Sequence, residues 1–139
     1  DHSVSTQTTM RVESALLSGG TEGAGSLGVT VGQVERADRR TVLVPLQITI
    51  ATDEVTTLKT ADGYRIELEL RTAAIDGWGR PSEIPVIPVV FTNSRPPAPG
   101  GFATYNTAVK LRRGDHDVLV TVYDPRLDRL LAKRVKIEG

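Results

Sequence analysis

Apolar and polar residues alternate along most of the chain that follows Leu27, in short runs separated by turn-forming residues. Such alternation places every second side chain on the same face, which is typical of a strand with one buried face. The clearest run covers residues 41–50, where every even-numbered position from Val42 to Ile50 is apolar. We therefore predict that this run is a core strand.

Seven runs of this kind predict an all-β fold. They cover residues 27–34, 41–50, 64–71, 84–91, 102–111, 117–123 and 130–137. Their number and spacing favour an immunoglobulin/fibronectin-III-like Greek-key sandwich of about seven strands, although a strand count alone also fits a barrel. No window shows the helical periodicity that an α/β fold requires.

Two features refine the expected sheets. Pro45, Pro85 and Pro88 lack an amide hydrogen, so we expect them at sheet edges, at bulges or where the ladder position faces outward. In the run 64–71, charged residues of both signs alternate with apolar ones. This row predicts a solvated outer face and consists of Arg65, Glu67, Glu69 and Arg71.

The composition changes near residue 26 and divides the chain in two. Residues 1–26 are rich in Ser, Thr and Gly and predict a flexible N-terminal arm, and residues 27–139 predict the β-sandwich domain. The arm holds one apolar patch, Val12–Leu17, which is too short for an independent helix. If it is ordered, we expect it to dock on the sandwich as a turn or an edge segment.

Charge and cysteine content exclude several classes of function. The chain has 17 Lys and Arg and 17 Asp and Glu residues, so it lacks the positive field that a nucleic-acid partner requires. The absence of cysteine removes thiol catalysis, disulfides and cysteine-ligated zinc. No apolar run is long enough to insert into a membrane, and no leader opens the chain, which is either cytosolic or already trimmed.

Histidine and acidic residues are the candidates for chemistry. His116 lies between Asp115 and Asp117, an arrangement that suggests a proton shuttle, but no nucleophile or ligand partner is recognisable nearby and a structural role is favoured. Other acidic residues occupy turns without the spacing of a calcium loop. The tripeptide Arg113–Asp115 matches the integrin-binding sequence, yet we interpret it as a turn. We predict no catalytic site, no metal and no cofactor.

The single tryptophan is the main candidate for binding. Trp78 lies between two glycines in the irregular segment 75–81, where it can form an exposed platform for a sugar ring or a partner's side chain, or fold back over the core. We assign the predicted binding site to Trp78, Arg80 and Tyr105. A sugar site would use Trp78 with Tyr105 or with one of two further aromatic residues, Tyr64 or Phe102, as stacking surfaces.

Two stretches resemble known families. Leu111, Gly114 and His116 are similar to the L-x-x-G-x-Y corner of fibronectin-III-type sandwiches, with histidine in the place of tyrosine. An imidazole at this position can donate a shorter hydrogen bond than the tyrosine hydroxyl. A longer stretch has an entry segment at Val12–Leu17, a core strand at Val42–Ile48 and a closing strand within Leu111–Asp124. By these features most of residues 12–138 resembles the C-terminal β-sandwich module of bacterial von Willebrand factor A-related secreted proteins.

That resemblance implies a secreted or periplasmic accessory domain without enzymatic activity, whose partner is another protein or the rest of a larger exported protein. The serine and aspartate metal motif of the A domain is absent, so no cation site carries over. Our first hypothesis is therefore a non-catalytic interaction module. The alternatives are a carbohydrate-binding module that uses Trp78 and an enzyme built around His116. The sequence leaves the oligomeric state open.

Overall fold

The computed structural model describes residues 25–82 and 85–138. Most of the predicted arm, including the apolar patch 12–17, lies outside the described residues, as do His2 and Ile84. The described residues form strands joined by turns and one short 3-10 helix, η1 (Thr52–Glu54), so the all-β prediction is confirmed. They contain no helix with the length and apolar character that a bilayer crossing requires.

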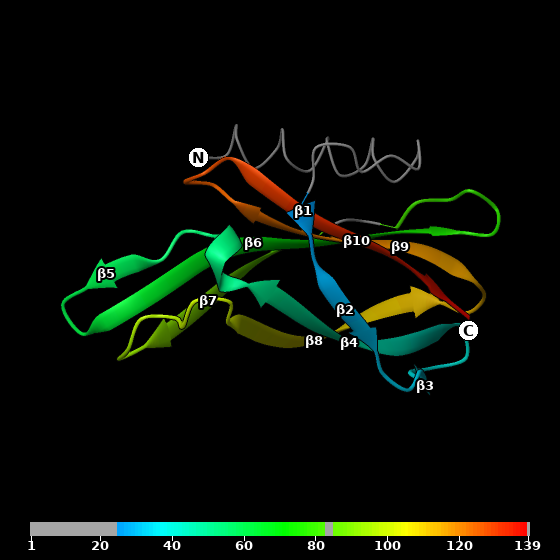
Figure 1. Cartoon of the computed structure of the whole chain (residues 1–139). Helices are drawn as coiled ribbons and strands as arrows, with labels where there is room; N and C mark the ends of the chain where they lie inside the picture. The colour runs from blue at the N-terminus through cyan, green and yellow to red at the C-terminus, as the bar shows by residue number, and fades with distance from the viewer. Residues whose placement is uncertain (1–24, 83–84, 139) are drawn as a thin grey trace.

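The strands form two separate sheets, which Figure 1 shows as two layers. The first sheet contains β2 (Gly28–Val31), β3 (Glu35–Arg36), β4 (Thr41–Ala51) and β8 (Phe102–Arg112). The second contains β1 (Gly25–Ser26), β5 (Leu58–Thr60), β6 (Gly63–Asp76), β7 (Val86–Asn93), β9 (His116–Asp124) and β10 (Arg129–Ile137).

Strand order in the sheets is that of a sandwich. In the first sheet β4 lies between β8 on one side and β2 and β3 on the other, and in the second the long strands follow the order β10-β9-β6-β7. The chain changes sheets four times among the described strands: between β1 and β2, between β4 and β5, between β7 and β8, and between β8 and β9. No described strand pairs across the two layers, so the sandwich prediction is confirmed over the barrel.

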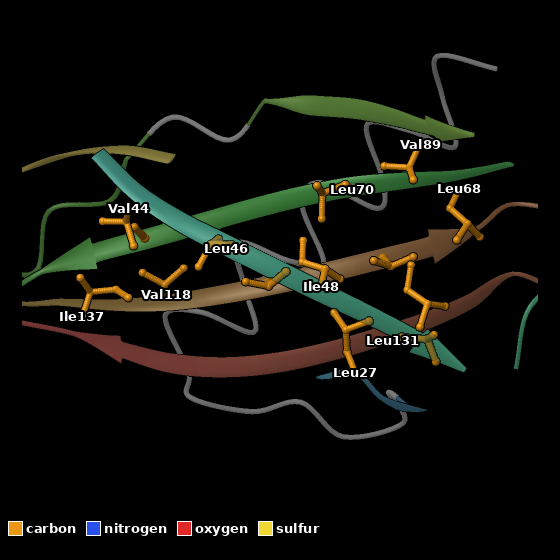
Figure 2. Close-up of a cluster of buried hydrophobic side chains, with 14 of the residues drawn as sticks. Leu27, Val44, Leu46, Ile48, Leu68, Leu70, Val89, Val118, Leu131 and Ile137 are labelled. Atoms are coloured by element: carbon orange, nitrogen blue, oxygen red, sulfur yellow. The ribbon is translucent and has the colours of Figure 1, made fainter. Parts of the chain in front are cut away.

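The core lies between the sheets and is built by the predicted alternation. In β4, Val42, Val44, Leu46, Ile48 and Ile50 are all buried, while the residues between them are more exposed. Their side chains point towards the second sheet, as Figure 2 shows for three of them. The second sheet contributes residues of β6, β7, β9 and β10, among which are Leu68, Leu70, Val89, Val118, Leu131 and Ile137.

The prolines occupy positions that need no amide hydrogen. Pro88 lies in β7, which among the described strands pairs with β6 alone and so forms an edge of the described sheet. Pro45 lies in the centre of its sheet, but it faces the break between β2 and β3, where Gly32 N donates to its carbonyl oxygen over 2.8 Å. A Cβ at Gly32 would lie 3.0 Å from the Pro45 ring, so the close approach favours glycine.

Several strand boundaries differ from those predicted from the sequence. The run 27–34 ends early, because β2 stops at Val31. Ile75 and Asp76, predicted to be irregular, extend β6 because they pair with Asp117 and His116 of β9. Gly25 and Ser26, placed in the arm by their composition, pair in parallel with β10.

The charged row of β6 is not uniformly solvated. Arg71 has no exposed surface, and its Nη2 lies 2.9 Å from Glu69 Oε1. The prediction of a solvated face is therefore wrong at Arg71, because a charge is buried only where polar partners replace the water that it loses.

Two leucines of β4 test whether burial rather than apolar character stabilises the fold. Leu46 is 2% exposed and Leu43, on the opposite face, is 37% exposed. We expect Leu46→Ala to lower the free energy of unfolding by about 2–5 kcal/mol, whereas Leu43→Ala should lower it by less than about 1 kcal/mol. Urea denaturation measures both. Equal losses would contradict the assignment of faces.

Candidate functional site

Trp78 projects from a turn that Asp76 holds closed. Oδ1 of Asp76 accepts hydrogen bonds from the backbone N–H groups of Trp78 (3.0 Å) and Arg80 (2.9 Å). Asp76 N donates to Arg80 O, and Gly79, whose φ is +79°, donates to Asp76 O. Trp78 is 85% exposed, so the structure presents this residue to solvent instead of folding it over the core.

Two arginines meet at the second oxygen of Asp76. Arg80 Nε and Arg112 Nη2 each lie 3.1 Å from Asp76 Oδ2. Because Arg112 ends β8 and Asp76 ends β6, this contact joins the two sheets at the end that carries Trp78. The hydrogen bond from the Arg80 N–H, helped by the Trp78 N–H and by the Arg80 guanidinium, lowers the pKa of Asp76 to about 2 against the opposing effect of desolvation.

The three predicted binding residues are not all brought together. Trp78 and Arg80 share the turn, and the Arg80 side chain is 64% exposed. Tyr105 lies in β8, half-buried, with its ring edge-on to Phe91 at a centroid distance of 6.5 Å. It precedes Arg112 by seven residues of one strand, a separation of roughly 23 Å. The structure thus separates Tyr105 from the Trp78 turn.

The opposite end of the sandwich holds a groove of about 370 Å³. It is bounded by the start of β6, the end of β7, the start of β8 and the connection between β7 and β8. In Figure 1 this is the end where β5 and β7 lie, away from the C-terminus. Its lining includes Thr52, Tyr64, Phe91, Asn93, Arg95 and Phe102.

This groove brings together the two further aromatic residues that the sequence suggested. Tyr64 is the second residue of β6 and Phe102 the first of β8, and both line this groove. Phe102 is 69% exposed. The connection that borders the groove is anchored, because Thr52 Oγ1 donates to Gly101 O and Gly100 N donates to Asp53 Oδ2. Sequence reasoning missed Phe91, Asn93 and Arg95, for which the proline-rich connection was the available signal.

His116 is the first residue of β9 and follows the turn that connects β8 to it. It is 4% exposed, and its Nδ1 lies 3.1 Å from the Gly114 carbonyl oxygen, to which it donates. Gly114 has a φ of +116°, and Leu111 is buried beneath the turn. This hydrogen bond is local to the turn between β8 and β9.

The surroundings of His116 include carboxylates but no shared site. A shallow hollow is lined by His116, Asp76, Asp115, Asp117, Lys136 and Glu138. Within residues 25–82 and 85–138, His116 Nε2 has no hydrogen-bond partner, and no three His, Asp or Glu side chains are placed to share a metal ion. Asp76, which belongs to the turn that carries Trp78, already forms ion pairs with Arg80 and Arg112.

Two other acidic turn residues, Asp124 and Asp38, accept hydrogen bonds from the backbone. Asp124 accepts from Thr56 N (2.7 Å) and Arg126 N (2.9 Å), and Asp38 accepts from Arg40 N and Thr41 N (2.9 Å each). The Arg40 N–H is the main cause of a lowered pKa at Asp38. Their positions agree with the interpretation of these residues as turn formers rather than calcium ligands.

Comparison with known proteins shows similarity at the level of the fold. No protein-family profile and no curated protein matches the chain. The crystal structure of a Bacteroides uniformis β-glucuronidase is similar over 84% of this chain with a TM-score of 0.51 and 12% identity. The similar region is 13% of that chain, so this chain spans only a small part of the enzyme's length.

Two further structures are more distant. A target of the Northeast Structural Genomics Consortium covers 82% of this chain and 84% of its own, with 12% identity and a TM-score of 0.46. A proposed β-galactosidase from Bacteroides fragilis covers 82% of this chain and 16% of its own, with 10% identity and a TM-score of 0.46.

The Asp76 network predicts a pH dependence of stability. The pKa of Asp76 is lowered from 3.8 to about 2 in the folded protein, so the ionised carboxylate stabilises the fold above pH 3.8, and this contribution is lost as the pH falls through about 2. We expect the difference in unfolding free energy between the wild type and Asp76→Asn to be constant above pH 5 and to shrink below pH 4. Urea denaturation across this pH range, followed by far-ultraviolet circular dichroism, measures it. A pH-independent difference would contradict the role of the carboxylate charge.

Proposed function

We propose that this chain is a non-catalytic accessory domain of an exported bacterial protein and that it binds a protein partner through the turn that carries Trp78. The observation that supports this most is the 85% exposure of Trp78 on a turn held by Asp76, Arg80 and Arg112. Tryptophan and arginine are enriched among the residues that dominate binding energy at interfaces. A turn closed by these hydrogen bonds loses little conformational entropy on binding.

Two observations support the assignment to an accessory sandwich. The strand order of the sheets and the buried His116 corner favour the immunoglobulin/fibronectin-III-like class and agree with the resemblance to von Willebrand factor A-related modules. Acidic side chains at both ends, such as Asp76 and Asp124, are engaged by backbone amides, and the two arginines also bind Asp76. A carboxylate engaged in this way is a poor general base.

Carbohydrate binding is the second candidate, and the groove at the far end favours it. Tyr64 and the exposed Phe102 offer ring surfaces, and Asn93 and Thr52 add polar groups beside them. Sites for small ligands combine apolar walls with a few polar groups in this way. The similar structure named above is a β-glucuronidase, an enzyme whose name refers to a sugar substrate. A sugar would then bind away from Trp78.

The interaction hypothesis predicts that one exposed side chain dominates capture of a partner. The wild-type chain, Trp78→Ala and Leu127→Ala are each immobilised. Each is incubated in parallel with the exported proteins of the bacterium that encodes the chain. Leu127 is a matched control because it is 56% exposed in a turn at the other end. We expect Trp78→Ala to weaken retention of the partner by about tenfold or more, and Leu127→Ala to leave it unchanged. Equal retention by all three chains would overturn the proposal.

The carbohydrate hypothesis predicts a different pattern. Titration of a panel of soluble oligosaccharides, followed by calorimetry and Trp78 emission, should show binding that Phe102→Ala weakens by about tenfold and Trp78→Ala does not affect. Trp78 emission should stay constant, because the groove lies at the opposite end. Absence of binding across the panel would remove this candidate. A glycan that shifts Trp78 emission would replace both assignments with a sugar site at the turn.

A further inference from the structure

The outward side of the second sheet holds side chains that are almost completely buried. Leu70, Val118 and Val122 point into the core, so alternation directs their neighbours outward. Five of these neighbours are between 0% and 2% exposed, and they are Arg71, Ala73, Leu119, Thr121 and Tyr123. Strand register makes them contiguous, because Ala73 faces Leu119, and Thr121 lies between Arg71 and Ala132. We call the five residues together with Ala132 the outer patch.

No described strand covers the outer patch. The strands β2, β4 and β8 of the described first sheet pack on the opposite side, where the core lies. A side chain on the free face of a sheet keeps part of its surface in water, as Val86 and Val90 do on β7 with exposures of 41% and 46%. Exposures near zero therefore require a covering layer.

Elimination identifies the source of this layer. The rest of the chain consists of residues 1–24, 83–84 and 139, and one or two residues cannot cover a patch that spans three strands. Gly25 pairs with Leu131, so the chain joins the sheet beside Ala132 of the patch (Figure 1). The eight residues from Leu17 to Gly25 can span up to about 26 Å, which exceeds the roughly 10 Å across three strands.

The chemistry of the N-terminal segment fits the outer patch. Ala73 and Leu119 form a small apolar cluster against which Ile75 and Ala132 pack. Residues 12–17, Val-Glu-Ser-Ala-Leu-Leu, are the most apolar stretch before Gly25. They also include one carboxylate, Glu13, and the outer patch includes the guanidinium of Arg71. An apolar stretch with one acidic residue complements an apolar face with a basic residue.

We propose that residues Val12–Leu17 dock on the outer patch as a third layer, so that the N-terminal segment is part of the domain and not a loose tether. This docking uses the broad face of β6, β9 and β10, not a sheet edge. It leaves the Trp78 turn and the groove at the two ends of the sandwich accessible, and it is independent of the proposed function.

Thiol reactivity in the full chain tests the proposal, because the protein has no cysteine of its own. Thr121→Cys introduces a thiol in the outer patch, and Thr30→Cys introduces an exposed one on the first sheet. We expect iodoacetamide to modify the thiol of Thr121→Cys about 100-fold more slowly. The double substitution Val12→Asp with Leu16→Asp is then added to each cysteine variant. It should release the segment, so that the modification rates of Thr121→Cys and Thr30→Cys differ by no more than about tenfold. The control substitutions Ser5→Asp with Thr21→Asp add the same charge to the same segment and should leave the difference unchanged.

A disulfide test is needed if the aspartate substitutions unfold the sandwich, and it adds no charge to the segment. Under mild oxidation, Leu16→Cys should crosslink with Ala132→Cys but not with Thr30→Cys on the opposite sheet. The proposal is overturned if this crosslink fails and protection of Thr121→Cys persists in the folded aspartate variant. Two other outcomes also overturn it. Fast modification of Thr121→Cys in the unaltered segment would show a face open to another partner, and protection that grows with protein concentration would show that a second copy covers it.

Discussion

The structure depends on one apolar layer that both sheets share. Every second side chain of β4 is buried against β6, β9 and β10, and Val44, Ile48, Leu70 and Val118 have no exposed surface at all. Burial of this kind fixes the register, because a shift by one residue would turn each apolar set towards water. The register in turn fixes which residues meet at the two ends, and both candidate sites lie there.

The two ends differ in what their residues can recognise. One end presents Trp78 on a turn whose only buried charge, Asp76, is matched by arginines from the same turn and from β8. The other end presents a groove in which rings from different strands lie near amide and hydroxyl groups. The first suits a protein surface that can enclose one large side chain, and the second suits a small ligand with both ring faces and hydroxyl groups. A sandwich holds both without a change in its core, because end loops contribute little to packing.

The outer patch shows that the faces of a sandwich are not equivalent. The first sheet keeps Leu43 and Phe102 partly in water, whereas the second sheet buries Leu119 and even Arg71. A buried guanidinium is tolerated only where its hydrogen bonds are satisfied, and Glu69 supplies one partner. This asymmetry is the observation on which the proposed docking of residues 12–17 rests.

The sequence by itself determined the strand class, the buried face of β4 and the edge position of Pro88, because each follows from local periodicity or from the chemistry of one residue. Only the tertiary structure decided that Tyr105 packs on Phe91 away from Trp78, that Tyr64 and Phe102 share a groove, and that Arg71 is buried. These facts depend on which strands become neighbours across sheets and on what covers each face. Alternation within one strand distinguishes two faces, but it carries no record of the partner that each face will meet.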